Sequence, residues 1–365
     1  MVVLRWHRRV VGRAFLAVED GTIGRETLTE VIAGAAGREA LSLWLDSVLW
    51  QEECAATLRA PLPAATATIC TRERPEDLDR ALRGMMAQRR QADEILVVDN
   101  APATDATRDV VARFPSVRYV VEPRRGLNVA RNRALREARN EIVAFNDDDA
   151  VPEPEWLGSL LANFRDHEVA CVTGLTLPLE LETPAQELFE EHCPFARGFR
   201  RRTFDVHHND PLAVGAVGAG ANMAVRRSTV LDLGGFDERL DAGTPTRSGG
   251  DHDMFIRLLI AGYRIVYDPA ALSWHRHRRT EEELLDTVYG YGVGVYAMWT
   301  GLLLERGEIG VVRLAWRWFR HEQSAILLGR SGGAARTRLA RAELRGCLRG
   351  PGAWLAARRL RAVEG

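Results

Sequence analysis

The chain has 365 residues, 46% hydrophobic and 27% charged, with a formal net charge of −1. This length allows one large domain with extensions or two domains, and the balanced charge gives no reason to expect a nucleic-acid partner. All 49 basic residues are arginine. The absence of lysine excludes enzymes that need one for pyridoxal phosphate, for a P-loop or for a protein-kinase site.

Two features of the sequence predict the compartment. The five cysteines are widely spaced, odd in number and without a C-x-x-C pair, which favours neither a zinc site nor a disulfide framework. Residues 1–20 lack an apolar signal core followed by a cleavage site. We therefore expect a cytoplasmic protein, and the exclusive use of arginine is typical of a GC-rich bacterial genome.

Residues 1–63 are predicted to form a helical N-terminal extension, because they lack the alternation of a strand. One apolar helix face is formed by Leu41, Leu45, Val48 and Leu49. Pro61 and Pro63 are expected to end this segment as a linker.

From residue 64 onward, short β-rich runs alternate with helical ones. The β-rich runs are ATATIC (65–70), EILVVDN (94–100), VRYVVE (117–122) and EIVAFN (141–146). This alternation predicts an α/β, Rossmann-like fold with a mostly parallel sheet flanked by helices. Ligands of such sheets bind beyond the carboxyl ends of the strands, where Thr71, Asp99 and Asp147 fall.

The turn after the first of these strands, TRERPED (71–77), contains no glycine. A dinucleotide-binding fold would need G-x-G-x-x-G there, so hydride-transfer chemistry is disfavoured.

Three aspartates, Asp147, Asp148 and Asp149, follow the apolar strand Ile142–Phe145. Such a run is compatible with a solvated turn or with a metal site. The uniformly apolar strand places the run at the ligand edge of the sheet. Residues at i and i+2 of an extended segment point the same way, so Asp147 and Asp149 should converge. Two hard oxygens on one side suit Mg²⁺ or Mn²⁺ bound together with a substrate diphosphate.

Asp99 and the arginines of RRGLNVARNRAL (124–135) each allow two interpretations. Asp99 either accepts hydrogen bonds from a base or ribose or begins a turn. Arg124, Arg125 and Arg131 either surround an anion at a helix start or are simply solvated.

These motifs, in this order, resemble the family 2 glycosyltransferases of the GT-A fold. The resemblance rests on TATICTRERPEDL, EILVVDNAPATDAT, RGLNVARNRAL, FNDDDAVPEPEWL, GAGANMAVRRSTVLDLGGFDERL and SGGDHDMFIRLLIAGYRIVYDP. It covers residues 64–280 and implies a GT-A domain there, with residues 1–63 and an arginine-rich region 281–365 as helical extensions.

The resemblance implies an inverting, metal-dependent transfer of a sugar from a UDP-, GDP- or dTDP-sugar to a hydroxyl of a glycan or lipid-linked acceptor. It suggests the nucleotide-binding residues Thr71, Asp99, Arg131 and Asp147. Asp149 would bind Mn²⁺ or Mg²⁺ as part of the D-x-D pair, and Asn222 and Asp148 would lie near the donor sugar or acceptor.

The family commonly carries Glu-Asp at the position of the catalytic base, where this chain has Gly250-Asp251. Asp251 is therefore the expected base, in preference to Asp253. Independently, Asp251 follows a glycine-bearing loop and starts an amphipathic helix, although a helix N-cap would explain it equally well.

His275 and His277 share a face of the extended run SWHRHRR (273–279). By the resemblance, His275 is the expected third metal ligand. The alternative is an exposed basic strand end.

The C-terminal region holds the longest uncharged stretch, residues 287–304, which we expect to be a buried or interfacial helix rather than a membrane span. WRWFR (316–320) and the following arginines could rest on anionic lipid, which predicts peripheral association with the inner face of the membrane. A solvated helix packed on the catalytic domain is the alternative.

Two other functions are compatible with an α/β fold that binds metal and nucleotide. A sugar-phosphate nucleotidyltransferase would typically need a glycine-rich first loop with basic side chains, often lysine. A non-catalytic nucleotide-sugar binder is favoured only by Gly250, whereas Asp147, Asp149 and Asp251 favour an enzyme.

Overall fold

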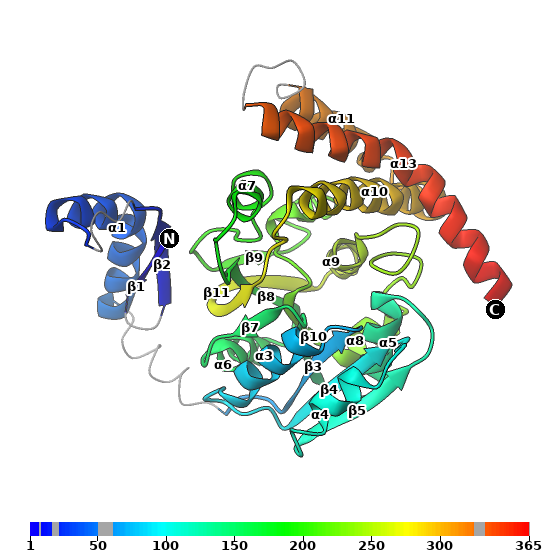
Figure 1. Ribbon diagram of the computed structural model, residues 1–365, viewed down its shortest axis with the longest axis horizontal. Coiled ribbons are helices and arrows are strands. Elements are labelled where there is room, and N and C mark those ends of the chain that lie inside the picture. The colour runs from blue at the N-terminus through cyan, green and yellow to red at the C-terminus, as the bar shows by residue number, and fades with distance from the viewer. Residues whose placement is uncertain (7–8, 17–21, 50–60, 325–332, 365) are drawn as a thin grey trace.

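The computed structural model describes residues 1–6, 9–16, 22–49, 61–324 and 333–364 (Figure 1). Its centre is a nine-stranded sheet with the order β5-β4-β3-β6-β10-β8-β11-β7, and β9 pairs with β11. These strands are β3 (Ala65–Thr71), β4 (Glu94–Asn100), β5 (Val117–Glu122), β6 (Ile142–Asn146), β7 (Ala150–Pro152), β8 (Val169–Pro178), β9 (Arg202–Phe204), β10 (Asn222–Arg226) and β11 (Arg264–His275).

Helices surround this sheet and extend from it. They are α3 (Pro75–Met86), α4 (Ala106–Val111), α5 (Leu127–Glu137), α6 (Trp156–Ala162), α7 (Pro184–His192), α8 (Arg227–Asp232), α9 (Gly250–Ile260), α10 (Glu281–Arg306), α11 (Gly310–Trp318) and α13 (Ala334–Glu364). Short helical turns are η1 (Asn163–Arg165), η2 (Val214–Ala216) and η3 (Phe319–Gln323).

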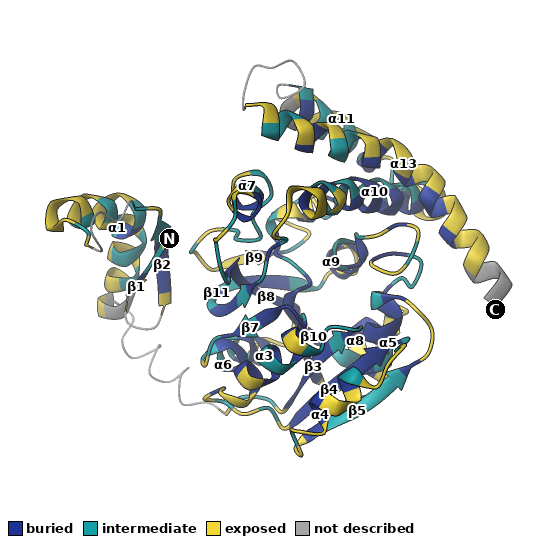
Figure 2. Ribbon diagram, viewed as in Figure 1, coloured by how far each residue is buried: buried dark blue, intermediate teal, exposed yellow. Residues whose placement is uncertain are grey.

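The expected α/β fold is confirmed. Strands β3, β4, β5 and β6 pair in parallel, and α3, α4 and α5 follow β3, β4 and β5 in the chain. Beyond β6 the sheet is mixed, because β10 runs antiparallel to both β6 and β8 while β8 and β11 are parallel. The interiors of β3, β4, β6 and β8 are largely apolar and buried on both faces, as helix-covered sheets require, whereas the edge strand β5 is half-buried (Figure 2).

The register brings the polar strand ends to one edge. Thr71 lies opposite Asp99, and Asn146, the last residue of β6, lies opposite Asn222. The turn Asp147–Asp149 starts from this edge.

The N-terminal segment is not all helical as predicted. It begins with an antiparallel hairpin of β1 (Val2–Trp6) and β2 (Arg9–Ala14), and α1 (Arg25–Leu49) follows. Valine-rich runs favour strands, and the helix pattern further along masked this signal. Gly12 allows close packing, because a Cβ there would lie 2.4 Å from the carbonyl oxygen of Ala35.

The apolar face predicted for α1 does not form part of a core. Leu41, Leu45 and Val48 are 56%, 41% and 49% exposed. The hairpin contacts the central sheet instead, where buried Val10 packs with Leu175 and Leu272.

Two long helices, α10 and α13, pack closely against each other above the sheet (Figure 1). Glycines make this approach possible: a Cβ on Gly292 would lie 2.2 Å from the Glu343 carbonyl oxygen, and one on Gly346 equally close to that of Tyr289. Of the glycines in the uncharged stretch 287–304, Gly292 and Gly301 thus contact α13, whereas Gly290 and Gly294 face Arg247 and Ser248. No helix among the described residues is long and apolar enough to cross a membrane. The division at residues 63 and 280 into three domains stays a prediction.

Trp354 of α13 anchors the C-terminal helices, since it is 2% exposed and its ring fits against Gly301 of α10. We expect Trp354→Ala to lower the free energy of unfolding by about 3–5 kcal/mol through lost burial and a residual cavity. Urea denaturation of the full chain measures it. The neighbouring Leu355, 45% exposed, provides the control, because Leu355→Ala should change stability by no more than about 0.5 kcal/mol. Equal effects of the two substitutions would contradict this packing.

Candidate active site

A cavity of about 1000 Å³ opens at the carboxyl ends of β3, β4 and β6. Its walls come from the turn after β6, the start of α5, the loop before α9, the end of β11 and the first turns of α10. Charged side chains dominate it: Arg72, Arg74, Arg125, Asp147, Asp148, Asp149, Asp241, Arg247, Arg278, Glu283 and Asp286. The cavity therefore lies where the strand ends predicted a ligand site.

The structure brings together Asp147, Asp149 and His275. One potential ligand atom from each lies within 4.8 Å of the others. Asp147 and Asp149 come from the turn after β6, and His275 is the last residue of β11. Two carboxylates and an imidazole suit Mn²⁺, which accepts both oxygen and nitrogen, better than Mg²⁺, which prefers oxygen. The ring nitrogen of His275 that faces Asp149 is Nε2, at 3.1 Å from the carboxylate, so it is the nitrogen placed to share a cation with Asp149.

Cationic side chains surround Asp149. His275 Nε2 lies 3.1 Å from one carboxylate oxygen, and Arg74 Nη1 and Arg278 Nη1 lie 2.9 and 3.6 Å from the other. Burial alone would raise the pKa of Asp149, but the charges of His275 and Arg74 hold this pKa well below its usual value. Asp149 is therefore an ionised ligand at neutral pH.

Asp148 points to a different set of partners. Thr71 Oγ1 donates to one of its oxygens at 2.7 Å, and Arg74 Nη1 donates to the other at 3.0 Å. Burial and the neighbouring charge of Asp149 raise the pKa of Asp148 to about 7. Asp148 and Thr71 both line the cavity, but they are bonded to each other, so Asp148 stabilises the turn that holds Asp147 and Asp149.

Arg131 of α5 lies buried beneath the cavity. It donates to Asp241 at 2.9 Å and to Asn128 at 3.2 Å, and it lies 4.0 Å from Asp147. Burial opposes the charge, but the carboxylates of Asp241 and Asp147 raise the pKa of Arg131. The guanidinium therefore links the Asp147 turn to the loop before α9.

Asp99 is fully buried and is not among the residues that line the cavity. Tyr119 donates to it at 2.7 Å, and burial raises its pKa. The next residue, Asn100, does line the cavity, and its side chain bonds to the backbone of Arg124 and Gly126 at 2.8 and 2.9 Å. Asn100 thus fixes the start of α5 against β4.

Asp251 lies in the first turn of α9, whose N-cap is Gly249. The N-cap interpretation of Asp251 is therefore wrong. Its two oxygens accept the backbone N–H groups of Gly220 at 2.7 Å and of His252 at 2.8 Å. Burial opposes ionisation, but the charges of His252 and Arg131 and these N–H groups lower the pKa of Asp251. Asp253 instead pairs with Arg257 at 2.7 Å inside the protein.

Asn222 does not contribute to the cavity, contrary to the expectation that it lies near donor or acceptor. Its side chain is fully buried; the amide oxygen accepts the indole N–H of Trp156 at 2.8 Å. Its amide N–H groups donate to the carbonyls of Leu175 and Ala271 at 2.9 and 3.0 Å. All of these bonds join strands and helices of the core, so the side chain is structural.

Strained backbone gathers around the cavity. The described residues other than glycine with positive φ are Glu73, Ala101, Asp241 and Arg247. Asp241 and Arg247 line the cavity, and Glu73 and Ala101 directly adjoin residues that line it. Such conformations persist only where surrounding contacts enforce them, and they are common at functional sites.

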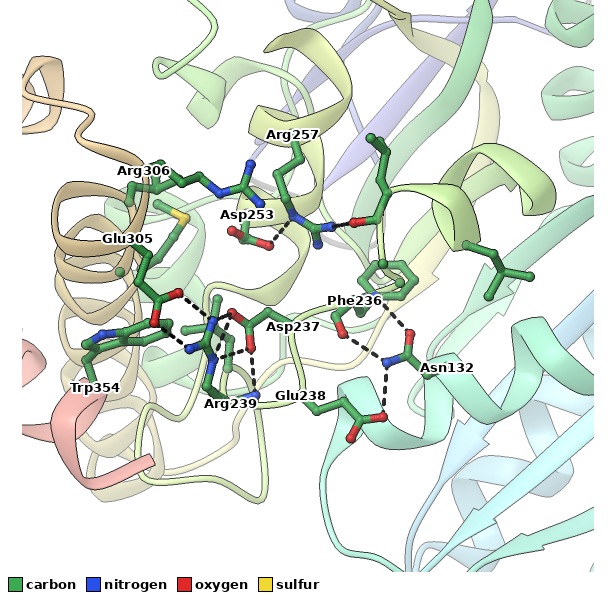
Figure 3. A pocket seen from close by; sticks show the side chains of 18 of the residues that line it. Asn132, Phe236, Asp237, Glu238, Arg239, Asp253, Arg257, Glu305, Arg306 and Trp354 are labelled. Carbon is green, nitrogen blue, oxygen red and sulfur yellow. Dashed lines mark hydrogen bonds and ion pairs between the residues drawn. The ribbon is translucent and has the colours of Figure 1, made fainter. Parts of the chain in front are cut away.

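A second cavity, of about 500 Å³, lies between the loop 231–240, α9, α10 and α13 (Figure 3). Arg239 forms ion pairs with both Asp237 and Glu305 and stacks 4.2 Å over the ring of Trp354. Asp253 and Arg257, one turn apart on α9, pair with each other at the wall of this cavity (Figure 3). These charges largely neutralise each other. The ion pairs and the stacking around this cavity therefore hold the C-terminal helices to the core.

Arg74, Arg278 and Asp241 take part in the site without having been predicted. Arg74 belongs to the TRERPED turn, but an arginine on a loop carries no sign of its partner. Asp241 occurs in a loop without periodicity, so only the folded chain reveals it.

The mixed sheet and the aspartate turn at its edge define the GT-A class of glycosyltransferase folds. Residues 66–228 match the family described as "Glycosyl transferase family 2". The match covers less than half of the chain, so the family is assigned to this segment alone.

Two glycosyltransferases are similar to this chain in sequence. The chain is 32% identical over 199 residues to the pre-mycofactocin glycosyltransferase of Mycobacterium tuberculosis, a match covering 54% of this chain and 40% of the relative. It is 25% identical over 232 residues to the glucosyl-dolichyl phosphate glucuronosyltransferase of Haloferax volcanii, covering 60% of this chain and 71% of that one. The chain thus spans less than half the length of the mycobacterial relative.

A solved structure shares the fold. The mannosyltransferase PcManGT of Pyrobaculum calidifontis, in complex with GDP-Man and Mn²⁺, aligns with a TM-score of 0.53 over 86% of this chain and 98% of its own, at 18% identity.

The cation cluster can be tested by Mn²⁺ binding alone. We expect Asp149→Asn to weaken Mn²⁺ binding at least about 100-fold, because it removes a charged ligand. Electron paramagnetic resonance titration of free Mn²⁺ measures this change. Unaltered affinity would show that the ion binds elsewhere.

Replacing Arg74 should have the opposite effect on the affinity for Mn²⁺. Because Arg74 competes with a cation for Asp149, we expect Arg74→Gln to tighten Mn²⁺ binding about fivefold to tenfold in the absence of nucleotide. Arg83→Gln, which removes an exposed arginine paired with Asp79, is the matched control and should leave the affinity unchanged. Weaker binding in Arg74→Gln would contradict the competition.

Proposed function

We propose that this chain transfers a sugar, with inversion, from a nucleoside-diphosphate sugar to an acceptor hydroxyl and depends on Mn²⁺ or Mg²⁺. The observation that carries this proposal is the grouping of Asp147, Asp149 and His275 in a large cavity at the ligand edge of the sheet. The family match supports it, and so does the complex of PcManGT with GDP-Man and Mn²⁺.

Each residue has a proposed part. Asp147, Asp149 and His275 hold the cation, which when bound neutralises the charge of the departing diphosphate. Arg74 and Arg278, freed from Asp149 by the cation, can donate to the phosphate oxygens. Thr71, Asp99 and Arg131 are proposed to support nucleotide binding, Thr71 as a residue that lines the cavity and the other two as buried residues outside its lining.

Asp251 is the proposed general base. Inversion requires a carboxylate that accepts the proton of the acceptor hydroxyl on the face opposite the leaving diphosphate. Both oxygens of Asp251 already accept one backbone N–H, which fixes the orientation of the carboxylate and leaves a lone pair on each oxygen. Its lowered pKa keeps it ionised at neutral pH.

The acceptor is proposed to be a glycan or a lipid-linked sugar, because α11 has the features of a helix that lies on a membrane. Ile309, Val312 and Trp316 form an exposed stripe along it, 76%, 55% and 62% exposed. Arg313, Arg317 and Arg320 are exposed beside this stripe. Apolar side chains with an interfacial tryptophan and neighbouring cations fit the surface of an anionic bilayer.

Donor turnover tests the enzymatic proposal. UDP-glucose, UDP-N-acetylglucosamine, GDP-mannose and dTDP-rhamnose are incubated with Mn²⁺ or Mg²⁺ and a panel of acceptors, and release of nucleoside diphosphate is measured. We expect turnover of at least one donor, lost on chelation and reduced at least about 100-fold by Asp251→Asn. Asp166→Asn, which changes an exposed aspartate paired with Arg264, is the control.

The two other functions give different outcomes. Pyrophosphate release from a nucleoside triphosphate and a sugar phosphate, without turnover of any nucleotide sugar, would establish a nucleotidyltransferase. Metal-dependent binding without turnover would establish a non-catalytic binder, which Gly250 favours.

Flotation with vesicles tests the membrane proposal. We expect the chain to float with vesicles of phosphatidylglycerol and phosphatidylcholine, less at high salt and less without the anionic lipid. Trp316→Ala combined with Ile309→Ser should reduce the bound fraction several-fold. Ile32→Ala, which changes an exposed apolar residue on α1, should leave it unchanged. Flotation that does not respond to salt or to the α11 variant would contradict the proposal.

A further inference from the structure

The loop between α8 and α9 brings Asp241 into the large cavity, where it lies with the turn Asp147–Asp149. Asp241 has a φ of 82°, a left-handed conformation that costs a residue with a side chain about 1 kcal/mol or more. Neighbouring contacts hold it there. Its carbonyl accepts the N–H and the hydroxyl of Thr244 at 3.2 and 2.8 Å, and its own N–H donates to the Ser248 carbonyl at 3.3 Å.

The carboxylate of Asp241 occupies the space that a side chain at position 250 would need. A Cβ on Gly250 would lie 2.7 Å from Asp241 Oδ2 and 2.1 Å from Asn128 Nδ2. An acid at position 250 and the observed position of Asp241 therefore exclude each other. The carboxylate that Gly250 does not provide comes instead from a residue nine positions earlier in the chain.

Asp241 shares Arg131 with the cation cluster and lies next to Gly250, the residue before Asp251. Arg131 donates to Asp241 at 2.9 Å and lies 4.0 Å from Asp147. A Cβ added to Gly220 would lie 3.0 Å from Arg131 Nη2 and 3.1 Å from Asp251 Oδ2, so these two groups lie near each other. Arg131 thus bonds Asp241, lies 4.0 Å from Asp147 and has Asp251 nearby, so a sugar held between a diphosphate and Asp251 would lie beside Asp241.

The carboxylate can bind hydroxyl groups in this position. Asp241 Oδ2 accepts from Arg131, and Oδ1 accepts the N–H of Ala242 at 2.9 Å. Each carboxylate oxygen has a further lone pair. Because Asp241 is only 9% exposed, a hydroxyl of a bound sugar could bond to it with little competition from water.

We propose that Asp241 binds hydroxyl groups of the donor sugar and that Arg131 and the absence of a side chain at position 250 position it. This inference rests on the proposed function. It assigns to Asp241 a part in recognising the sugar and none in binding the nucleotide.

The test separates the sugar from the nucleotide. Calorimetry with Mn²⁺ gives the dissociation constants of UDP, GDP and dTDP and of UDP-glucose, GDP-mannose and dTDP-rhamnose. For the pair that the wild type binds, the measured quantity is the affinity for the nucleotide sugar relative to that for its nucleoside diphosphate. We expect Asp241→Asn to lower this ratio about tenfold or more and to leave the affinity for the diphosphate within about twofold, because one charge-assisted bond is lost.

Gly250→Ala provides a second variant, since its Cβ must displace the Asp241 carboxylate, and it should lower the same ratio. Asp166→Asn is the matched control, and thermal unfolding confirms that each variant is folded. An unchanged ratio in Asp241→Asn and Gly250→Ala would overturn the assignment, and so would an equal loss of affinity for both ligands. Failure of the wild type to bind any of these nucleotides would instead overturn the proposed function.

Discussion

Three adjacent carboxylates at the end of a buried strand impose the main physical constraint on this protein. Each loses hydration and repels the others, so the fold must supply positive charge nearby. Arg74, Arg278 and His275 supply it for Asp149, and Arg131 supplies it for Asp147. Since the chain has no lysine, guanidinium groups provide most of this charge, and one nitrogen of Arg74 bonds two aspartates at once.

This arrangement leaves the site ready for a divalent ion. Arg74 comes from the loop after β3 and Arg278 from the segment after β11, so both can exchange a carboxylate for a phosphate without moving the sheet. Arg131 differs, because it is buried and bonded on several sides. We infer that Arg131 is the fixed side chain that keeps the cation cluster, Asp241 and Asp251 in constant positions relative to one another.

The C-terminal helices contribute to the site through the loop that carries Asp241. Arg239 lies two residues before Asp241 and is fixed by Glu305 of α10 and by Trp354 of α13 (Figure 3). On the other side of the loop, Ser248 Oγ donates to the Gly290 carbonyl of α10 at 3.0 Å. The strained backbone of Asp241 is therefore held from both ends by helices outside the family 2 match.

Much of the fold was predictable from the sequence because it depends on local periodicity. The alternation of β-rich and helical runs gave the parallel part of the sheet, and the spacing of Asp147 and Asp149 placed their ligand atoms together. Features that depend on partners far along the chain were not predictable. Asn222 lies in a glycine-rich motif typical of binding sites, yet its amide is used by three core residues. The N-terminal hairpin was missed because its strands are short and precede a strongly helical segment. Asp241 was missed because its position in the cavity depends on a left-handed backbone conformation, which no sequence pattern indicates.

The most direct test of the central claim is the position of manganese in crystals grown with Mn²⁺ and a nucleoside diphosphate, located by anomalous scattering. We expect an anomalous peak bonded to Asp149, with Asp147 or His275 as a further ligand and diphosphate oxygens completing the shell. A peak elsewhere, or a nucleotide bound without an ion at Asp149, would contradict it.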